Sequence, residues 1–141
     1  MPTKYNAKKV ILDGYTFDST AESLYYQLLL KQKAEGLILN FELQPKFTIQ
    51  AKFEKYGRKH QQIQYVGDFA IAHHDGTIEV VDVKGMATAT ATMKRKMFDF
   101  AYPDIELTWV VRNIKWGDPD GWVDYDELKK IRAIGKKVKN A

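Results

Sequence analysis

The stretch Val80–Gly85, VVDVKG, places a carboxylate and an ammonium group two residues apart inside an otherwise apolar strand. Successive side chains of a strand point to opposite faces of its sheet, so Asp82 and Lys84 share one face. Another carboxylate, Asp68, interrupts the apolar segment YVGDFAI earlier in the chain. Two carboxylates beside a lysine could hold a divalent cation and act on a phosphate group.

Whether Asp68 meets Asp82 depends on the loop between the two strands. A two-residue Asp-Gly turn would place Asp68 opposite Val83 and send its side chain to the other face. A three-residue loop, His74–Gly76, whose glycine takes the left-handed conformation, would place Asp68 opposite Asp82. The sequence HHDG suits the three-residue loop.

In that register the two carboxylates repel each other, which raises one pKa unless a cation lies between them. Oxygen ligands without cysteine favour a hard ion, Mg²⁺ or Mn²⁺. Lys84 could then orient or deprotonate an attacking water, or stabilise charge on the phosphate. The competing interpretation is structural, with Asp82 and Lys84 forming an ion pair at an exposed sheet edge.

The hydrophobic pattern predicts a mixed α/β fold around these residues, with the order helix, three strands, helix, strand, helix behind a small hairpin. The expected elements are a hairpin of Val10–Leu12 and Tyr15–Phe17, and helices at 18–36, at 90–102 and from a cap at Asp124. Strands are expected within 42–54, where Pro45 marks the start, and at 61–72, 77–85 and 105–111. The first three main strands should form an antiparallel meander. The fourth follows a helical crossover, so it should run parallel to an earlier strand.

Composition limits the classes of protein to consider. A chain of 141 residues with 45% hydrophobic residues fits one compact domain, residues 1–141. Cysteine is absent, which excludes disulfides and thiolate zinc sites and fits a reducing cytoplasm. No apolar run is long enough to span a membrane. The net charge is +4, and Lys and Arg cluster at 55–60, 94–96 and 129–139, either to track a phosphate backbone or as ordinary solvated surface.

The succession E…GD…DVK, with the segments YTFDSTAESLYYQLL, LQPKF, GDF, VVDVKG and KMFDFAYPDIELTWV, resembles the PD-(D/E)XK nuclease superfamily. It is similar to small phage- and prophage-encoded endonuclease-like proteins, which include Holliday-junction-resolvase-like members. The resemblance covers roughly Asp13 to Val111. It implies a restriction-endonuclease-like core, Mg²⁺- or Mn²⁺-dependent hydrolysis of DNA phosphodiesters, and action in the cytoplasm of a bacterial host cell.

Carried over by position, the resemblance implies that Asp68, Asp82 and the backbone carbonyl of Val83 are metal ligands. Lys84 would be the catalytic lysine, and Glu22 on the first helix would complete the site directly or through water. The rival explanation for Glu22 is a capping box with Ser19, since it ends the segment STAE.

Two departures from the superfamily pattern concern the acidic positions. Gly67 replaces the proline of the motif, and Asp82 replaces the commoner glutamate, which shortens the reach of that carboxylate by one methylene. His73 and His74 fall in the expected turn and should point apart, which disfavours a zinc pair.

DNA contacts are expected from residues around this centre. Gln44 could approach the ion or a phosphate, or simply mark the entry to a strand. Lys94 and Lys96 could grip DNA or form a solvated helix face, and Thr88 could hydrogen-bond to phosphate with Thr90 and Thr92. Related junction-resolving enzymes act as dimers, so a homodimer is a further expectation. The alternative functions are a DNA-binding or recombination-accessory protein without turnover, and a metal-free interaction domain.

Overall fold

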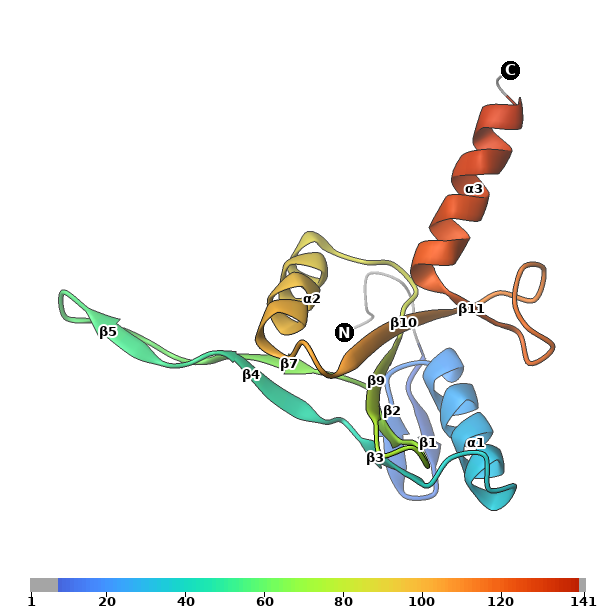
Figure 1. Ribbon diagram of the computed structural model, residues 1–141, viewed down its shortest axis with the longest axis horizontal. Coiled ribbons are helices and arrows are strands. Elements are labelled where there is room, and N and C mark those ends of the chain that lie inside the picture. Colours follow the sequence, from blue (N-terminus) through green and yellow to red (C-terminus); the bar gives the residue numbers. More distant parts are fainter. Residues whose placement is uncertain (1–7, 140–141) are drawn as a thin grey trace.

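The computed structural model describes residues 8–139 of the chain. Three helices and eleven strands lie in this part (Figure 1). The helices are α1 (Thr20–Ala34), α2 (Ala89–Ala101) and α3 (Tyr125–Lys139). The strands are β1 (Val10–Leu12), β2 (Tyr15–Phe17), β3 (Asn40–Leu43), β4 (Lys46–Gln50), β5 (Phe53–Lys55), β6 (Arg58–His60), β7 (Ile63–Val66), β8 (Phe69–Ala72), β9 (Ile78–Val83), β10 (Glu106–Arg112) and β11 (Trp122–Asp124).

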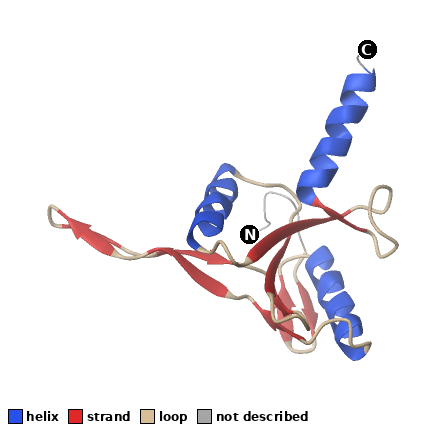
Figure 2. Ribbon diagram, in the orientation of Figure 1, coloured by secondary structure: helices blue, strands red, loops and turns tan. Residues whose placement is uncertain are grey.

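A mixed sheet forms the centre of the fold, and strands are red in Figure 2. It has five strands in the order β11-β10-β9-β8-β3. Strands β3, β8 and β9 are antiparallel neighbours, and β10 runs parallel to β9 after the α2 crossover. The expected mixed α/β architecture, with its antiparallel meander and one helical crossover, is confirmed. The N-terminal hairpin of β1 and β2 and the C-terminal helix are also present.

The helices cover opposite faces of the sheet. Val81 is buried in a cluster with Leu29 of α1 and Phe69, whereas its neighbour Val80 is buried in a second cluster with Phe98 of α2. Because adjacent strand residues point to opposite faces, α1 and α2 lie on either side of β9. The carboxyl end of β9 therefore has helical structure on both sides.

Capping explains where α1 and α3 begin. The Ser19 hydroxyl accepts the Glu22 backbone N–H at 3.1 Å, as expected for the start of α1. The Asp124 carboxylate accepts the backbone N–H of Glu127 at 3.1 Å, which confirms the expected cap of α3. In α2, Phe98 is buried against Tyr65 and Val80, whereas Met93 is 53% exposed.

The strand expected to start at Pro45 and run to residue 54 begins as predicted, since β4 starts at Lys46, but it is divided into β4 and β5. Strand β3, which starts at Asn40 and ends just before Gln44, was not predicted. The break between β3 and β4 follows from Gln44, whose φ of +50° is left-handed, and from Pro45, which cannot donate to a ladder. The strand expected over 61–72 is likewise split into β7 and β8, at Gly67–Asp68. Strands β6 and β11 were not predicted.

These breaks divide the long meander into two parts. Strands β3 and β8 belong to the central sheet, while among residues 8–139 β4 pairs only with β7 and β5 only with β6. The two extra pairs continue away from the sheet as a long ribbon (Figure 1). The Gln44 N–H donates to the Asp68 carbonyl at 2.9 Å and the Gly67 N–H to the Pro45 carbonyl at 3.0 Å, so the two breaks lie side by side.

The β8–β9 register is the one set by a three-residue loop. Phe69 pairs with Val81 and Ala72 with Ile78, and the His73 N–H donates to the Thr77 carbonyl at 3.0 Å. Gly76 has a φ of +87°, the left-handed conformation that this loop requires. One step beyond the last ladder pair, Asp68 therefore falls beside Asp82, as expected.

No helix within residues 8–139 combines the length and the apolar character needed to cross a membrane.

Candidate functional site

Asp68, Asp82 and Lys84 meet at the carboxyl end of β9. The Asp68 backbone N–H donates to Oδ1 of Asp82 at 2.7 Å, and the Val83 N–H donates to Oδ2 of Asp68 at 2.8 Å. The Lys84 ammonium lies 3.7 Å from Oδ2 of Asp82. The three-residue register thus joins two carboxylates and one lysine, although they are 16 residues apart along the chain.

Asp82 lies at the base of this group, only 3% exposed, and is held by residues that the sequence did not single out. The Tyr65 hydroxyl donates to Oδ2 of Asp82, and the Trp109 indole N–H donates to the Tyr65 oxygen at 2.9 Å. Burial and the nearby Asp82 charge raise the pKa of Tyr65, so this hydroxyl keeps its proton and acts as a donor. Tyr65 and Trp109 fix the position of the Asp82 carboxylate.

The side chain of Glu22 lies with the acidic residues, and its backbone contributes to the α1 cap. Its backbone N–H completes the cap with Ser19, while its side chain is 7% exposed and borders the same space as Asp68. Burial, followed by the charge of Asp18, raises the pKa of Glu22, and Asp82 contributes in the same direction. The cap therefore positions the start of α1 so that its third residue faces the end of β9.

A hollow of about 670 Å³ opens between the start of α1 and the ends of β9 and β10. Its charged lining residues include Glu22, Asp68, Lys84 and Arg112. We refer to it as the site hollow. Arg112, which sequence reasoning missed, donates to the Asp120 carbonyl at 2.9 Å, and this contact anchors it at the rim.

Gln44 lies on the other side of Asp68. It lines an adjoining hollow of about 350 Å³ together with Glu22 and Asp68. Its left-handed backbone turns the chain at this point, between β3 and β4. Gln44 thus lies close to the acidic residues, as one of its two interpretations required.

The pKa values of both aspartates in the site are raised, because burial disfavours their charged forms. Burial, the Asp82 charge and the Glu22 charge raise the pKa of Asp68 to about 8. Burial also raises the pKa of Asp82, although the Tyr65 hydroxyl and the Lys84 ammonium oppose this rise. A cation placed among these groups would relieve their mutual repulsion and compensate for their lost hydration.

The donor set for such a cation consists of oxygens. Within residues 8–139, no three Asp, Glu, His or Cys side chains are arranged to hold a metal ion among themselves. Mg²⁺ is commonly bound by one or two carboxylates and completes its shell with water and substrate phosphate oxygens. Asp68 and Val83 line the site hollow, and the buried Asp82 is hydrogen-bonded to the Asp68 backbone, so two carboxylates are close enough for that smaller requirement.

Lys84 lies between the acidic group and an aromatic ring. Its ammonium is 4.7 Å from the centre of the Trp109 ring, and its side chain is 22% exposed. The guanidinium of Arg95, 4.1 Å from the same ring, also contacts Asp126 of α3 at 3.1 Å. Two cations therefore contact one indole, and Lys84, which also lines the site hollow, has a defined position beside Asp82.

Only some of the residues expected to contact DNA lie close to one another. Thr88 and Lys96 line a separate hollow of about 590 Å³ with Lys129, whereas Lys94 is half-buried on α2. The Thr88 hydroxyl accepts the Ala91 N–H at 3.1 Å and caps α2, a structural role that the sequence analysis did not assign.

The two adjacent histidines have separate partners. His73 contacts Oε1 of Glu79 at 3.0 Å, and His74 contacts the Gly36 carbonyl at 2.7 Å. The two side chains therefore point apart, which is the arrangement that the sequence predicted.

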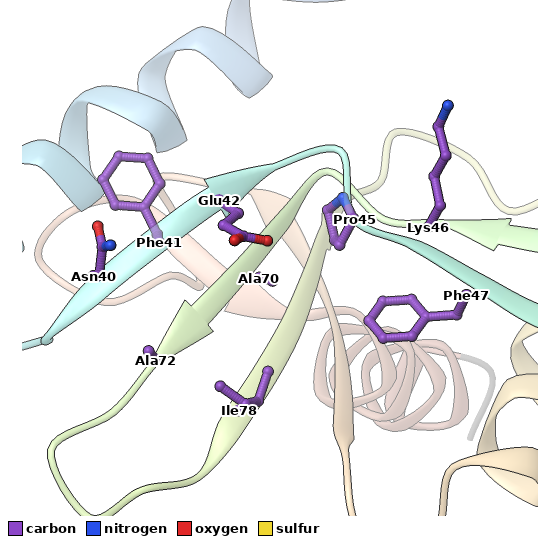
Figure 3. Close-up of a pocket in the computed structure, with 9 residues that line it drawn as sticks. All are labelled: Asn40, Phe41, Glu42, Pro45, Lys46, Phe47, Ala70, Ala72 and Ile78. Carbon is purple, nitrogen blue, oxygen red and sulfur yellow. The ribbon is translucent and has the colours of Figure 1, made fainter.

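A further hollow, of about 350 Å³, lies over β3, β8 and β9, on the face away from α1 (Figure 3). Ala70, Ala72 and Ile78 form its floor, and Glu42 is its only carboxylate among the described lining residues. With one isolated carboxylate, this hollow lacks the grouped charges of the site hollow.

Comparison with protein families gives one match, to a family described as "Protein of unknown function (DUF1064)", over residues 2–118. No curated protein matches the chain. The match covers strands β1 to β10, both helices that flank the central sheet, and each residue of the acidic group. The chain therefore belongs to the DUF1064 family.

Proposed function

We propose that this protein is a Mg²⁺- or Mn²⁺-dependent endonuclease of the PD-(D/E)XK type that hydrolyses phosphodiester bonds in DNA. One observation carries the proposal. Asp68 and Asp82, from antiparallel segments, are hydrogen-bonded into one group beside Lys84, at the end of a central strand and next to an open hollow. The sequence resemblance to PD-(D/E)XK nucleases, together with the element order, adds support.

The raised pKa values of the carboxylates support a cation-binding role rather than a purely structural one. A buried ion pair of Asp82 with Lys84 alone would need no second acidic residue. Asp68 adds a second carboxylate, and its pKa of about 8 means that its charge is poorly compensated by the protein itself. Residues that lower folded-state stability in this way are typical of functional sites.

In this proposal Asp68, Asp82 and the Val83 carbonyl hold the ion. Such an ion supplies Lewis acidity toward a phosphodiester and lowers the pKa of water. Tyr65 and Trp109 keep Asp82 in place, because each of their polar hydrogens is committed to this chain of hydrogen bonds. The protein thus holds its ligands in position before substrate arrives.

Lys84 would act on the water or on the phosphate. Its ammonium has three N–H groups, and the adjacent Asp82 faces it from one side, with Oδ2 at 3.7 Å. The remaining N–H groups can donate to an attacking water or to a phosphate oxygen whose negative charge increases during the reaction. Glu22, on the opposite wall, can accept a hydrogen bond from the water and orient it.

A cleavage assay with matched variants tests the proposal. Supercoiled, linear duplex and branched DNA would be incubated with the protein in Mg²⁺, in Mn²⁺ and in EDTA. We expect strand cleavage that needs the metal and is lost in Asp68→Asn and in Lys84→Met. The controls are Asp99→Asn on α2 and Lys31→Met on α1, which make the same chemical changes at exposed positions.

Two results would contradict the proposal. One is the absence of cleavage by the wild-type protein on every DNA structure with both metals. The other is equal nicking by Asp68→Asn and by the wild type, since it would identify a contaminating nuclease. Calorimetric titration with Mn²⁺ gives a separate readout, in which the wild type should bind and Asp68→Asn should bind much more weakly.

A further inference from the structure

The ribbon that leaves the central sheet ends in an exposed hairpin. Strands β5 and β6 pair only with each other, with Phe53 opposite His60, Glu54 opposite Lys59 and Lys55 opposite Arg58. All six strand residues are exposed. The strands join through Tyr56–Gly57, both with positive φ (49° and 76°), which is the geometry of a tight type I′ turn. Figure 1 shows this arm projecting well beyond the rest of the fold.

The two faces of the arm differ in charge. Because opposed residues share a face, Lys55 and Arg58 lie together on one face, next to the Phe53 and His60 rings. Glu54 and Lys59, of opposite sign, share the other face. We call the first of these the cationic face. Neither Lys55 nor Arg58 forms an ion pair with any residue in the described part of the chain.

The cationic face destabilises the free arm. Like charges directly opposite each other in an antiparallel pair are unfavourable, and an isolated two-stranded hairpin is only marginally stable in water. An anionic partner on this face would remove the repulsion. Residues 51–62 carry four Lys or Arg and one Glu, a net charge of +3, compared with +4 for the whole chain. The arm is therefore a strongly basic part of the surface that a polyanion can reach, and residues 129–139 of α3, with six Lys or Arg, are another.

Aromatic rings beside the charges indicate which polyanion fits. The Phe53 and His60 rings are stacked, with their centres 4.6 Å apart and their planes at 20°. Tyr56 at the tip is 88% exposed, and the Lys55 ammonium lies 5.7 Å from its ring centre. Flat rings interleaved with cations suit nucleic acid, which offers phosphates and base surfaces together, better than an acidic protein surface.

We infer that the β5–β6 arm binds double-stranded DNA, entering the major groove with its cationic face toward the phosphates. The major groove admits a two-stranded β-ribbon, and the tight turn keeps the tip of the arm narrow. This inference rests on the proposed function for the identity of the polymer. It goes further by assigning DNA binding to Lys55, Arg58 and the arm tip, away from the residues that would hydrolyse the phosphodiester.

A binding measurement without hydrolysis tests the arm. Fluorescence anisotropy with a short labelled DNA duplex, in Ca²⁺ or in EDTA and over a range of KCl concentrations, would compare the wild type with Lys55→Gln/Arg58→Gln. Loss of two phosphate contacts should reduce the slope of log K against log salt by about 1.8 and weaken binding about tenfold. The matched control is Lys31→Gln/Lys33→Gln, which removes the same charge from exposed positions on α1.

The double arm variant should melt at the wild-type temperature or above it, because it removes a like-charge pair from an exposed hairpin. Unchanged DNA affinity of this variant, or an equal loss in the α1 control, would overturn the inference. Binding of polyglutamate as tight as that of a duplex, with the same dependence on the arm, would indicate an acidic protein partner and would also overturn it. DNA that is bound through the arm but never cut would instead refute only the proposed nuclease activity.

Discussion

Replacing Asp68 by Asn tests the electrostatics of the site without any substrate. Asp68 ionises near its ordinary pKa of 3.8 in an unfolded chain, but only at about 8 in the folded, metal-free protein. Between these values the folded protein holds a proton that the unfolded chain has lost. The free energy of unfolding therefore falls as the pH rises through this window. Asn carries no charge, and its amide oxygen can still accept the Val83 N–H.

The expected size of the effect follows from the pKa of Asp68. Each pH unit inside the window lowers the free energy of unfolding by about 1.4 kcal/mol, so the wild type can lose up to about 4 kcal/mol between about pH 5 and about pH 8. Asp68 is only partly buried and water reaches the site hollow, so we expect about half of that upper bound, about 2 kcal/mol.

Urea denaturation in EDTA at several pH values would measure this difference. The Asp68→Asn variant should lose less stability than the wild type as the pH rises, and the Asp99→Asn control should follow the wild type. Wild-type and Asp68→Asn stabilities that stay parallel over the whole pH range would refute the reasoning. Mn²⁺ should raise the stability of the wild type at the higher pH and have little effect on Asp68→Asn, since only the wild type offers both carboxylates.

Three further substitutions test how the site is supported. Tyr65→Phe should lower the free energy of unfolding by about 1–3 kcal/mol in urea denaturation, because it leaves the buried Trp109 N–H without an acceptor; an unchanged midpoint would contradict this. Gly67→Ala should lower the free energy of unfolding by about 1–3 kcal/mol, because the added Cβ would lie 2.6 Å from a Val80 methyl group. A melting temperature equal to that of the wild type would contradict this and would show that the strand can shift. Ser19→Ala should lower the free energy of unfolding by about 1 kcal/mol through loss of the α1 cap, with Ser19→Asp as the variant that should restore it.

The strand register was predictable because its determinants are local. A His-His-Asp-Gly segment between two apolar runs specifies a loop, and Gly76 is the residue in it that takes a left-handed conformation most readily. Once the loop length is set, the period of two along each strand brings Asp68 to Asp82 without any knowledge of the rest of the fold.

The short strands escaped prediction for the opposite reason. Strand β3 has four residues and β11 only three, too few for alternation to stand out from chance. Their pairing partners, β8 and β10, supply the information that their own sequences lack. The start of β4 was predicted from Pro45, whereas the left-handed conformation of Gln44, which lets β3 precede it, is not specified by the sequence pattern.

The acidic centre was visible in the sequence, whereas its support was not. Asp68, Asp82 and Lys84 stand out because charged residues interrupt apolar strands. Tyr65 and Trp109 resemble ordinary core aromatics, and only the parallel pairing of Trp109 with Asp82 shows that their polar atoms are needed there. A buried Tyr or Trp near a buried carboxylate is nevertheless a usable signal, since both require hydrogen-bond partners.

The segment that follows the DUF1064 match has a consequence for anyone who shortens this chain. The match ends at residue 118, yet Trp122 of β11 lies edge-on to Tyr25 of α1, with ring centres 4.9 Å apart, and is itself only 6% exposed. The Tyr125 and Trp109 rings also pack edge-on, on the opposite face of the central sheet. A fragment that ends at residue 118 would lose the edge strand β11 and would expose aromatic rings on each side of the sheet, so the end of the family match is not a safe place to shorten the chain.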